Sequence, residues 1–341
     1  MKEFGEIPPR DGPHRATSYD VAQLAKVSQS AVSRCFRPGG SISPEMRKRV
    51  LKAAATLGYQ PNAMASGLIT KRSNLVAILI SNLTNLHYPQ VLAELTQRFD
   101  ANGIRVLLFA LQAESDVGRA LDQVWRYRVD GVIAAARLSP AQLAQFDRHG
   151  VPVVLYNRIG ESDPVASVHC DSAGGERLLI ERLCAKGHKR FAIIAGPSDS
   201  FVSNERVESA RLALERHGIV PRIVPGNFDH ESGGAAATAL LSAKTRPDAI
   251  VCANDLMAIG ALDSARHVFG LNVPAELSIV GFDGVGPAAW PSYQLTTIRQ
   301  PVRRMTDAAV TMLIDRIENP DLPPEVRSFS GALIEGTSAR I

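Results

Sequence analysis

The hydrophobic positions between Tyr19 and Phe36 are spaced as in two short helices joined by a tight turn. The apolar residues that share the first helical face are Val21, Leu24, Ala25 and Val27. Those that the second helix turns inward are Ala31, Val32 and Phe36. Ser28 lies between the two sets, where its hydroxyl would cap the second helix. The pattern predicts a helix-turn-helix, although any small helical hairpin with a polar face would share this periodicity.

A third helix follows and favours the first interpretation. Ser43, Pro44 and Glu45 combine a capping serine, a proline at the first helical position and an acid in the first turn. The helix is predicted to run through Val50 to a terminating Gly58. Three such helices are typical of a small DNA-binding headpiece. The second helix would expose hydrogen-bonding side chains that can reach base edges in a major groove, namely Gln29, Ser30, Ser33 and Arg34.

From Leu75 onward, short apolar runs alternate with amphipathic stretches. The predicted buried strands are Leu75–Ile80, Arg105–Phe109, Gly131–Ala135, Pro152–Leu155, Phe191–Ile194, Ala249–Cys252 and Leu277–Val280. The predicted helices are Tyr88–Asn102, Ser115–Arg128, Pro140–His149, Ala173–Lys186, Asn204–His217, Gly233–Ala243 and Leu256–Val268. This alternation indicates parallel sheets with crossover helices. The predicted fold class is therefore α/β, with a three-helix headpiece followed by two doubly wound lobes.

Polar side chains follow several of the predicted strands. They are Asn82, Asn85, Gln112, Asn157, Arg158, Asn254, Asp255 and Asp283. In open α/β sheets, ligands bind beyond the carboxyl ends of the strands, so a cleft between the lobes is the predicted binding site. Taken singly, each residue fits a turn or a helix cap better, because Asn and Asp favour those positions. Their convergence at one edge favours a ligand site.

Charge is distributed unevenly along the 341 residues. The chain carries a net charge of +4, yet the residues through Arg72 hold 12 Lys and Arg against 5 Asp and Glu. A basic N-terminal segment followed by a mildly acidic remainder is typical of a nucleic-acid-binding domain attached to a domain that binds a different ligand. Residues 1–15 are rich in Pro, Gly and charge, and are predicted to be a disordered extension.

Cysteine usage and the chain's beginning predict a cytoplasmic protein. The four cysteines are widely spaced, which fits buried thiols in a reducing compartment better than a metal or redox motif. The first residues lack the apolar core of a signal peptide, and the longest apolar run, Leu75–Ile80, is too short to cross a bilayer.

Catalysis is not predicted. Gly174-Gly175 and Gly233-Gly234 lack the further residues of a phosphate-binding loop. Serine, histidine and aspartate are plentiful but fall in no nucleophile-elbow context. We therefore expect no catalytic residue, no bound metal and no cofactor.

Several short motifs at fixed spacing resemble the lactose-repressor (LacI/GalR) family of bacterial transcription regulators. In the headpiece they are Tyr19-Asp20-Val21-Ala22, Val27-Ser28, Val32-Ser33-Arg34 and Leu57-Gly58-Tyr59-Gln60-Pro61-Asn62. In the body they are Gly187-His188, Ala195-Gly196-Pro197, Arg206, Pro247-Asp248-Ala249-Ile250, Ala253-Asn254-Asp255-Leu256-Met257-Ala258-Ile259-Gly260, Val280-Gly281-Phe282-Asp283 and Leu295-Thr296-Thr297-Ile298. The resemblance covers nearly all of the chain after residue 16.

The resemblance implies a set of DNA contacts. Gln29, Ser30 and Arg34 would read bases, whereas Thr17, Tyr19, Ser28, Ser33 and Ser43 would contact phosphates and position the headpiece. Residues 61–73 would form a hinge helix that orders when two copies meet over the minor groove. Within it the DNA-contacting positions would be Asn62, Ala65 and Leu68, with Leu68 inserted between base pairs as a wedge.

The resemblance also implies an effector site and a division into lobes. Arg206, Asn254 and Asp283 would bind the effector from the second lobe, Asn157 from the lobe junction, Phe228 by stacking, and Tyr88 and Gln112 from the first lobe. The headpiece would span residues 16–60, the first lobe 74–171 with 299–330, and the second 172–298 with 331–341. This set of side chains suits a sugar. For Arg206 the alternative is an ion pair on a helix surface.

The expected protein is a homodimer or tetramer that binds operator DNA and a small-molecule effector. Repression relieved by an inducer is the expected mode, and corepression would use the same parts. The main alternative is a solute-binding protein of a transport system, which shares the two-lobed fold. A helix-turn-helix in place of an export signal favours the regulator.

Overall fold

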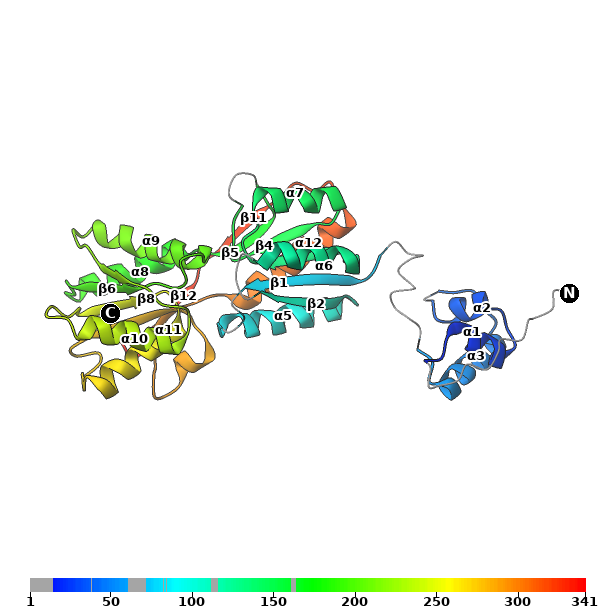
Figure 1. Cartoon of the computed structure of the whole chain (residues 1–341), viewed down its shortest axis with the longest axis horizontal. Helices are drawn as coiled ribbons and strands as arrows, with labels where there is room; N and C mark the ends of the chain where they lie inside the picture. The colour runs from blue at the N-terminus through cyan, green and yellow to red at the C-terminus, as the bar shows by residue number, and fades with distance from the viewer. Residues whose placement is uncertain are drawn as a thin grey trace. The chain divides into compact units, whose positions relative to one another are not determined.

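A computed structural model describes residues 15–37, 39–60, 72–81, 83, 85–111, 116–160 and 164–341. The chain divides into two compact units, Met1–Ser73 and Asn74–Ile341. The helical unit and the larger α/β unit are both visible in Figure 1.

The first unit contains the three predicted helices, and each begins at a hydroxyl cap. They are α1 (Ser18–Ala25), α2 (Gln29–Cys35) and α3 (Pro44–Leu57). Thr17 and Asp20 form a capping box at α1, with the Thr17 N–H donating to Asp20 Oδ2 at 2.7 Å. Ser28 accepts from the N–H of Ala31 at α2, and Ser43 accepts from that of Met46 at α3. The hydroxyl caps therefore set the helix starts that the sequence predicts.

Small apolar side chains form the core of this unit. The buried members are Val21, Ala22, Ala25, Val32, Cys35, Val50, Ala53 and Ala54. The prediction that Leu24 belongs to the core is wrong, because its side chain is 51% exposed. At about 100° per residue, Val21, Ala22 and Ala25 centre the buried face of α1, and Leu24 lies about 100° around the helix from that centre.

Two arginines of α3 bind the carbonyl groups that end the other two helices. Arg47 Nη1 donates to the carbonyl of Cys35 at 2.9 Å, and Arg49 Nη2 donates to that of Ala25 at 2.5 Å and of Lys26 at 2.9 Å. The last carbonyls of a helix lack intrahelical partners and carry partial negative charge, so cations there are stabilising. Part of the basic charge of this unit therefore holds its three helices together.

The second unit contains two six-stranded sheets. The first sheet has the order β11-β5-β4-β3-β1-β2 and is parallel throughout. Its strands are β1 (Leu75–Ser81), β2 (Arg105–Leu111), β3 (Gly131–Ala135), β4 (Val153–Tyr156), β5 (Ser167–Cys170) and β11 (Val326–Phe329). Ile78 of β1 is in register with Leu108 of β2 and Ile133 of β3.

The second sheet has the order β12-β10-β9-β8-β6-β7 and is parallel except for β12, which pairs antiparallel with β10. Its strands are β6 (Phe191–Ile194), β7 (Arg222–Val224), β8 (Ala249–Cys252), β9 (Ser278–Asp283), β10 (Thr296–Arg299) and β12 (Ala332–Ile334). The predicted pair of doubly wound lobes is confirmed.

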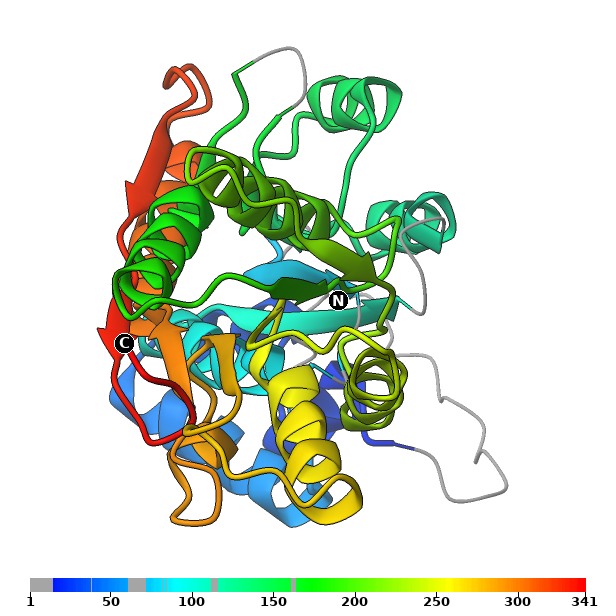
Figure 2. The ribbon, with the colours of Figure 1, turned by 90° about the vertical axis from the view of Figure 1, so that its left-hand side faces the viewer.

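Helices cover both faces of each sheet, which explains why the strands read as continuous apolar runs. At the first sheet, α5 (His87–Ala101) and α12 (Val302–Glu318) pack on one face, and α6 (Val117–Tyr127) and α7 (Pro140–His149) on the other. At the second, α8 (Ser172–Ala185) and α9 (Phe201–Glu215) oppose α10 (His230–Leu241) and α11 (Asp255–Asp263), as Figure 2 shows. A π-helical turn, Ser264–Val268, extends α11, and a short 3-10 helix spans Gly286–Ala289.

The chain passes between the lobes at three neighbouring places. It leaves the first sheet after β5, returns to the first lobe after β10, and passes to the second sheet again after β11. A methyl group added at Gly331, in the third passage, would lie 2.4 Å from the side chain of Ile298 and 3.6 Å from Cys170 Sγ. The three passages are therefore packed together beside the ends of the strands.

Candidate nucleic-acid interface and ligand site

The outward face of α2 carries the side chains predicted to read bases. Ser30 and Arg34 are exposed, while Gln29 and Ser33 are partly buried. Gln29 Nε2 donates to Ser18 Oγ at 3.3 Å, and the hydroxyls of Ser28 and Ser30 lie 2.9 Å apart. These bonds tether the start of α2 while Arg34 remains open to solvent.

Of the residues predicted to contact phosphates, three are the helix caps Thr17, Ser28 and Ser43. A capping hydroxyl accepts a hydrogen bond from the helix and can still donate its own O–H to a DNA phosphate. The unpaired N–H groups at the start of a helix also favour an anion such as a phosphate. Tyr19 is 63% exposed in the first turn of α1. Asn62, Ala65 and Leu68 lie outside the described residues, as does the whole segment 61–71.

In the second unit a small pocket lies where the strand ends of the two lobes meet. Its lining residues are Asn85, His87, Tyr88, Asn157, Arg158, Ser200, Val202, Arg206, Phe228, Asp283 and Gln300. Five residues predicted to bind the effector are among them: Tyr88, Asn157, Arg206, Phe228 and Asp283. Its free volume of about 10 Å³ holds about one water molecule, whereas ligand pockets span about 300–1,000 Å³. The lobes are therefore closed on each other at this point.

Arg206 and Asp283 form an ion pair that is almost completely removed from water. Arg206 Nη2 lies 2.8 Å from Asp283 Oδ1, and each side chain is 2% exposed. Arg206 also donates to the carbonyl of Ala253 at 2.6 Å and lies over the ring of Phe282. Burial is the largest single effect and would lower the pKa of Arg206, but the charge and hydrogen bond of Asp283, together with Glu176 and Cys170, raise it overall. The alternative of a helix-surface ion pair for Arg206 is therefore wrong.

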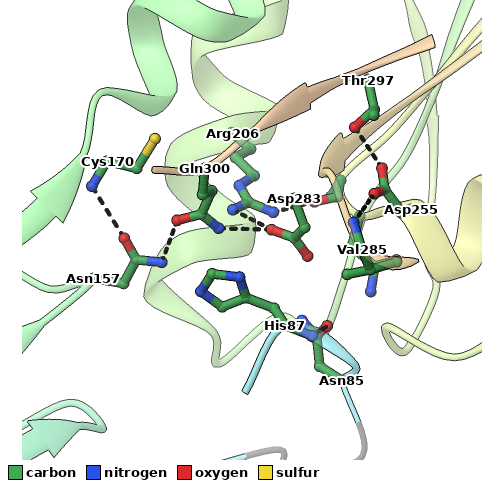
Figure 3. A network of polar contacts seen from close by, with 12 residues as sticks. Asn85, His87, Asn157, Cys170, Arg206, Asp255, Asp283, Val285, Thr297 and Gln300 are labelled. Atoms are coloured by element: carbon green, nitrogen blue, oxygen red, sulfur yellow. Dashed lines mark hydrogen bonds and ion pairs between the residues drawn. The ribbon is translucent and has the colours of Figure 1, made fainter. Parts of the chain in front are cut away.

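A line of hydrogen bonds connects this ion pair to the first lobe (Figure 3). Gln300 Nε2 donates to Asp283 Oδ1 at 2.7 Å, and Gln300 Oε1 accepts from Asn157 Nδ2 at 2.8 Å. Asn157 Oδ1 accepts from the backbone N–H of Cys170 at 3.1 Å. Because Gln300 follows β10 and Cys170 ends β5, the line joins two of the passages between the lobes.

Asn254, the remaining described residue of the predicted effector set, does not line the pocket. Its Oδ1 accepts from the N–H of Met257 and caps α11, and its Nδ2 donates to the carbonyl of Phe228 at 2.9 Å. Phe228 has φ of 61°, a backbone conformation that non-glycine residues rarely adopt. Asn254 thus fixes the loop that presents the Phe228 ring. Gln112 lies outside the described residues.

Three buried titratable groups surround the ion pair. Burial lowers the pKa of His87 to about 4 and raises that of Glu176 to about 8. Burial and the nearby Asp283 raise the pKa of Asp255 to about 7, although Asp255 accepts from Thr297 Oγ1 at 2.5 Å and from the N–H of Val285 at 2.8 Å. His87 and Glu176 are therefore predominantly neutral at pH 7.

Four lining residues were not predicted from the sequence: His87, Ser200, Val202 and Gln300. Gln300 follows β10 directly, so the placement of polar residues after strands would have identified it once β10 was recognised. Ser200 caps α9, and a hydroxyl just before a helix is an available signal for that role.

Within the described ranges, no helix is long and apolar enough to cross a membrane. In the same part of the chain, no group of three His, Cys, Asp or Glu side chains is arranged to hold a metal ion.

A helix-turn-helix unit joined in one chain to a two-lobed body with a polar interlobe pocket defines a ligand-responsive DNA-binding regulator. Residues 17–62 match the model of bacterial regulatory proteins of the lacI family, and residues 180–339 match that of the periplasmic binding protein-like domain. The chain belongs to the lacI family and is a DNA-binding transcription regulator.

Known relatives support this assignment along the whole chain. The catabolite control protein A of Priestia megaterium is 30% identical over 87% of this chain and 91% of the relative. The ribose operon repressor of Halalkalibacterium halodurans is 31% identical over 90% and 92%. The lac repressor dimer bound to operator and the anti-inducer ONPF has a TM-score of 0.85 at 28% identity, over 95% of this chain and 99% of that one. These matches favour a transcription regulator over the alternative of a solute-binding protein of a transport system.

Proposed function

We propose that this regulator is a repressor that binds operator DNA as a homodimer and changes its operator affinity when a small polyhydroxy metabolite enters the interlobe pocket. The observation that carries this proposal is the line of hydrogen bonds from Arg206 and Asp283 through Gln300 to Asn157. A ligand that engages the ion pair necessarily acts on side chains that also hold two of the passages between the lobes.

The coupling follows from the closed pocket. With room for about one water molecule, the pocket admits a metabolite only when the lobes move apart or the lining side chains shift. Occupied and empty chains then differ in lobe orientation, and a ligand changes DNA affinity by its differential affinity for the two arrangements. Inducer and corepressor correspond to opposite signs of this difference.

At the DNA, we assign base reading to Gln29, Ser30 and Arg34, and phosphate contacts to Thr17, Tyr19, Ser28, Ser33 and Ser43. The exposed guanidinium of Arg34 on α2 supports the first assignment, because a bidentate contact from arginine to guanine is a frequent specific contact in major grooves. The three capping hydroxyls support the second. Residues 61–73, with Asn62, Ala65 and Leu68, are assigned to the hinge by resemblance alone.

For the effector we assign Tyr88, Asn157, Arg206, Phe228 and Asp283 as direct contacts, Asn254 as the residue that positions Phe228, and Gln112 by resemblance alone. We further propose that the protein is cytoplasmic and not an enzyme, since members of its family act as transcription regulators. The lobe boundaries proposed are 74–171 with 299–330 and 172–298 with 331–341. The sheet to which each strand belongs supports this division, apart from Arg299, which is the last residue of β10 and pairs within the second sheet.

Selection of genomic fragments on the full-length chain, followed by fluorescence anisotropy with and without a metabolite panel, tests the proposal. We expect a sequence-preferring affinity that falls steeply with salt, and at least one metabolite that changes it. Arg34→Ala should reduce the preference for the selected site by about tenfold or more, whereas Tyr19→Phe, at a residue assigned to phosphate contacts, should weaken all fragments alike.

A substitution at Asp283 tests the assignment of this residue to effector binding. Asp283→Asn should keep operator affinity and lose the metabolite response, and Asp122→Asn, which changes an exposed carboxylate of α6, should keep both. Equal loss of DNA binding and metabolite response in Asp283→Asn would contradict the assignment of this residue to the effector. Absence of any sequence preference in the wild-type chain would overturn the regulator itself.

A further inference from the structure

His87 is the first residue of α5 and brings an imidazole from the first lobe into the pocket. The residue is 2% exposed, and its ring packs edge to face on Tyr88 with 5.5 Å between the ring centroids. Figure 3 shows the ring facing Arg206 and Asp283 of the second lobe. His87 therefore meets the effector-binding ion pair from the opposite side of the pocket.

Most hydrogen-bonding atoms around the pocket are already engaged. Asp283 Oδ1 accepts from both Arg206 and Gln300, and the side-chain amides of Gln300 and Asn157 are used on both ends. By contrast, His87 Nε2, Asp283 Oδ2 and Arg206 Nε are buried and have no hydrogen-bond partner among the residues that the structure describes. Buried polar groups are rarely left unpaired, so His87 Nε2 and Asp283 Oδ2, which lie on opposite sides of the pocket, point to a missing partner.

The chemistry of the two atoms restricts that partner. An ionised carboxylate only accepts hydrogen bonds, so Asp283 Oδ2 needs a donor. A neutral imidazole carries one N–H donor and one acceptor nitrogen. If His87 Nε2 carries the proton, it can donate to the same group that donates to Asp283 Oδ2. A hydroxyl group does both at a single oxygen, whereas an ionised carboxylate offers Asp283 no donor.

We propose that His87 is a further effector-contacting residue, and that in its neutral form it selects, together with Asp283, a hydroxyl group of the effector. The hydroxyl donates to Asp283 Oδ2 and accepts from His87 Nε2. This inference rests on the proposed function and names the chemical group that its pocket takes.

The surroundings of His87 make the contact dependent on pH. Burial is the largest effect and lowers the pKa of His87 to about 4, Asp283 at the end of β9 raises it, and Arg206 on α9 and Arg158 after β4 lower it. In an open, hydrated pocket the pKa returns toward 6.5. Closing the pocket is thus favoured above about pH 6.5 and loses support as the pH falls from there toward about 4.

The linkage gives a measurable expectation. Because the free chain already encloses a neutral His87, binding that keeps this form should change by less than about twofold between pH 7.5 and pH 5.5. His87→Gln keeps a donor and an acceptor without titrating, so it should retain binding at both pH values. His87→Phe keeps a ring without polar atoms and should bind about tenfold more weakly at pH 7.5.

The first test needs no ligand. Nuclear magnetic resonance titration of the full chain, with the His87 imidazole signal identified by its loss in His87→Gln, should show no titration of this group between pH 7.5 and 5. A His87 pKa between 6 and 7 would overturn the proposal, because the imidazole would then be hydrated rather than enclosed.

The second test uses calorimetry with a fixed panel of neutral hydroxyl compounds: D-ribose, D-glucose, D-galactose, myo-inositol and adenosine. Succinate, sulfate and indole serve as comparators that carry no hydroxyl group at the pH of the measurement. Binding of a panel member with the variant and pH behaviour above supports the proposal. Binding restricted to the comparators, or equal binding by all three forms of residue 87, overturns it. If neither group binds or changes DNA affinity, the proposed function fails instead.

Discussion

Breaking the buried pair of Arg206 and Asp283 should destabilise the body, and the size of the effect can be worked from the geometry. The two charged atoms lie 2.8 Å apart and each side chain is 2% exposed. Removing one partner of such a pair costs about 3–5 kcal/mol, because the other charge stays buried without compensation. In Asp283→Asn the amide oxygen can still accept from Arg206, which offsets about 1 kcal/mol and leaves about 2–4 kcal/mol.

A double-mutant cycle separates the pair from its surroundings. Arg206→Met alone should cost about 3–5 kcal/mol, since Asp283 then keeps only Gln300 as a donor. The double variant removes both charges of the pair, so its loss should fall short of the sum of the single losses by about 2 kcal/mol or more.

Urea denaturation followed by tryptophan fluorescence is a suitable assay, because both tryptophans, Trp125 and Trp290, lie in the body and none lies in the headpiece. Asp122→Asn, an exposed change on α6, should stay within about 0.5 kcal/mol of the wild type. Single losses below about 1 kcal/mol, or losses that simply add, would refute the reasoning that two desolvated charges compensate each other here.

Three further predictions concern other places in the chain. Glu176→Gln should remove a pH dependence of stability: a folded-state pKa of about 8 means that wild-type stability falls as pH rises from about 4.5 to about 8, by up to about 4 kcal/mol at pH 7.5, measured by urea denaturation. Gly196→Ala should weaken effector binding in calorimetry, because the added methyl would lie 2.4 Å from the ring of Phe228. Arg49→Met should lower the melting temperature of the headpiece, followed by circular dichroism, by removing the bonds to the carbonyl of Ala25.

Matched controls exist for each of these. Glu181→Gln, on the exposed side of the same helix as Glu176, should leave the pH profile unchanged. Gly118→Ala, where nothing lies within 4 Å of the added methyl, should leave effector binding unchanged. Lys52→Met should leave the headpiece as stable as before. A control that behaves like its partner variant would contradict the corresponding contact as the cause.

Central apolar strands could be predicted from the sequence, whereas two edge strands could not. Gly131–Ala135, Phe191–Ile194 and Ala249–Cys252 were predicted with their observed bounds, because strands covered on both faces read as uninterrupted apolar runs. By contrast, β7 (Arg222–Val224) and β11 (Val326–Phe329) are edge strands that contain charged or polar residues and are only partly covered. Their pairing depends on neighbours distant in sequence, which local periodicity does not report.

At the ligand site, the residue types were predictable but their partners were not. The family resemblance placed Arg206 and Asp283 at the effector, yet nothing in their spacing indicated that they bind each other across 77 positions. His87 was missed because the predicted helix began one residue later, and an isolated histidine between apolar neighbours carries no signal of its own. Burial and unpaired atoms, which identify it, exist only in the folded chain.

The buried hydrogen bond from Gln300 to Asp283 also restricts how the two halves of the body can move. Rotation about an axis through this contact leaves it intact, whereas a sliding displacement would break it and leave a buried amide and a buried carboxylate without this partner. The two lobes should therefore move by hinge rotation. A bound ligand then acts on one angle, and a preference of about 2.7 kcal/mol for one of the two lobe arrangements changes the ratio of their populations a hundredfold.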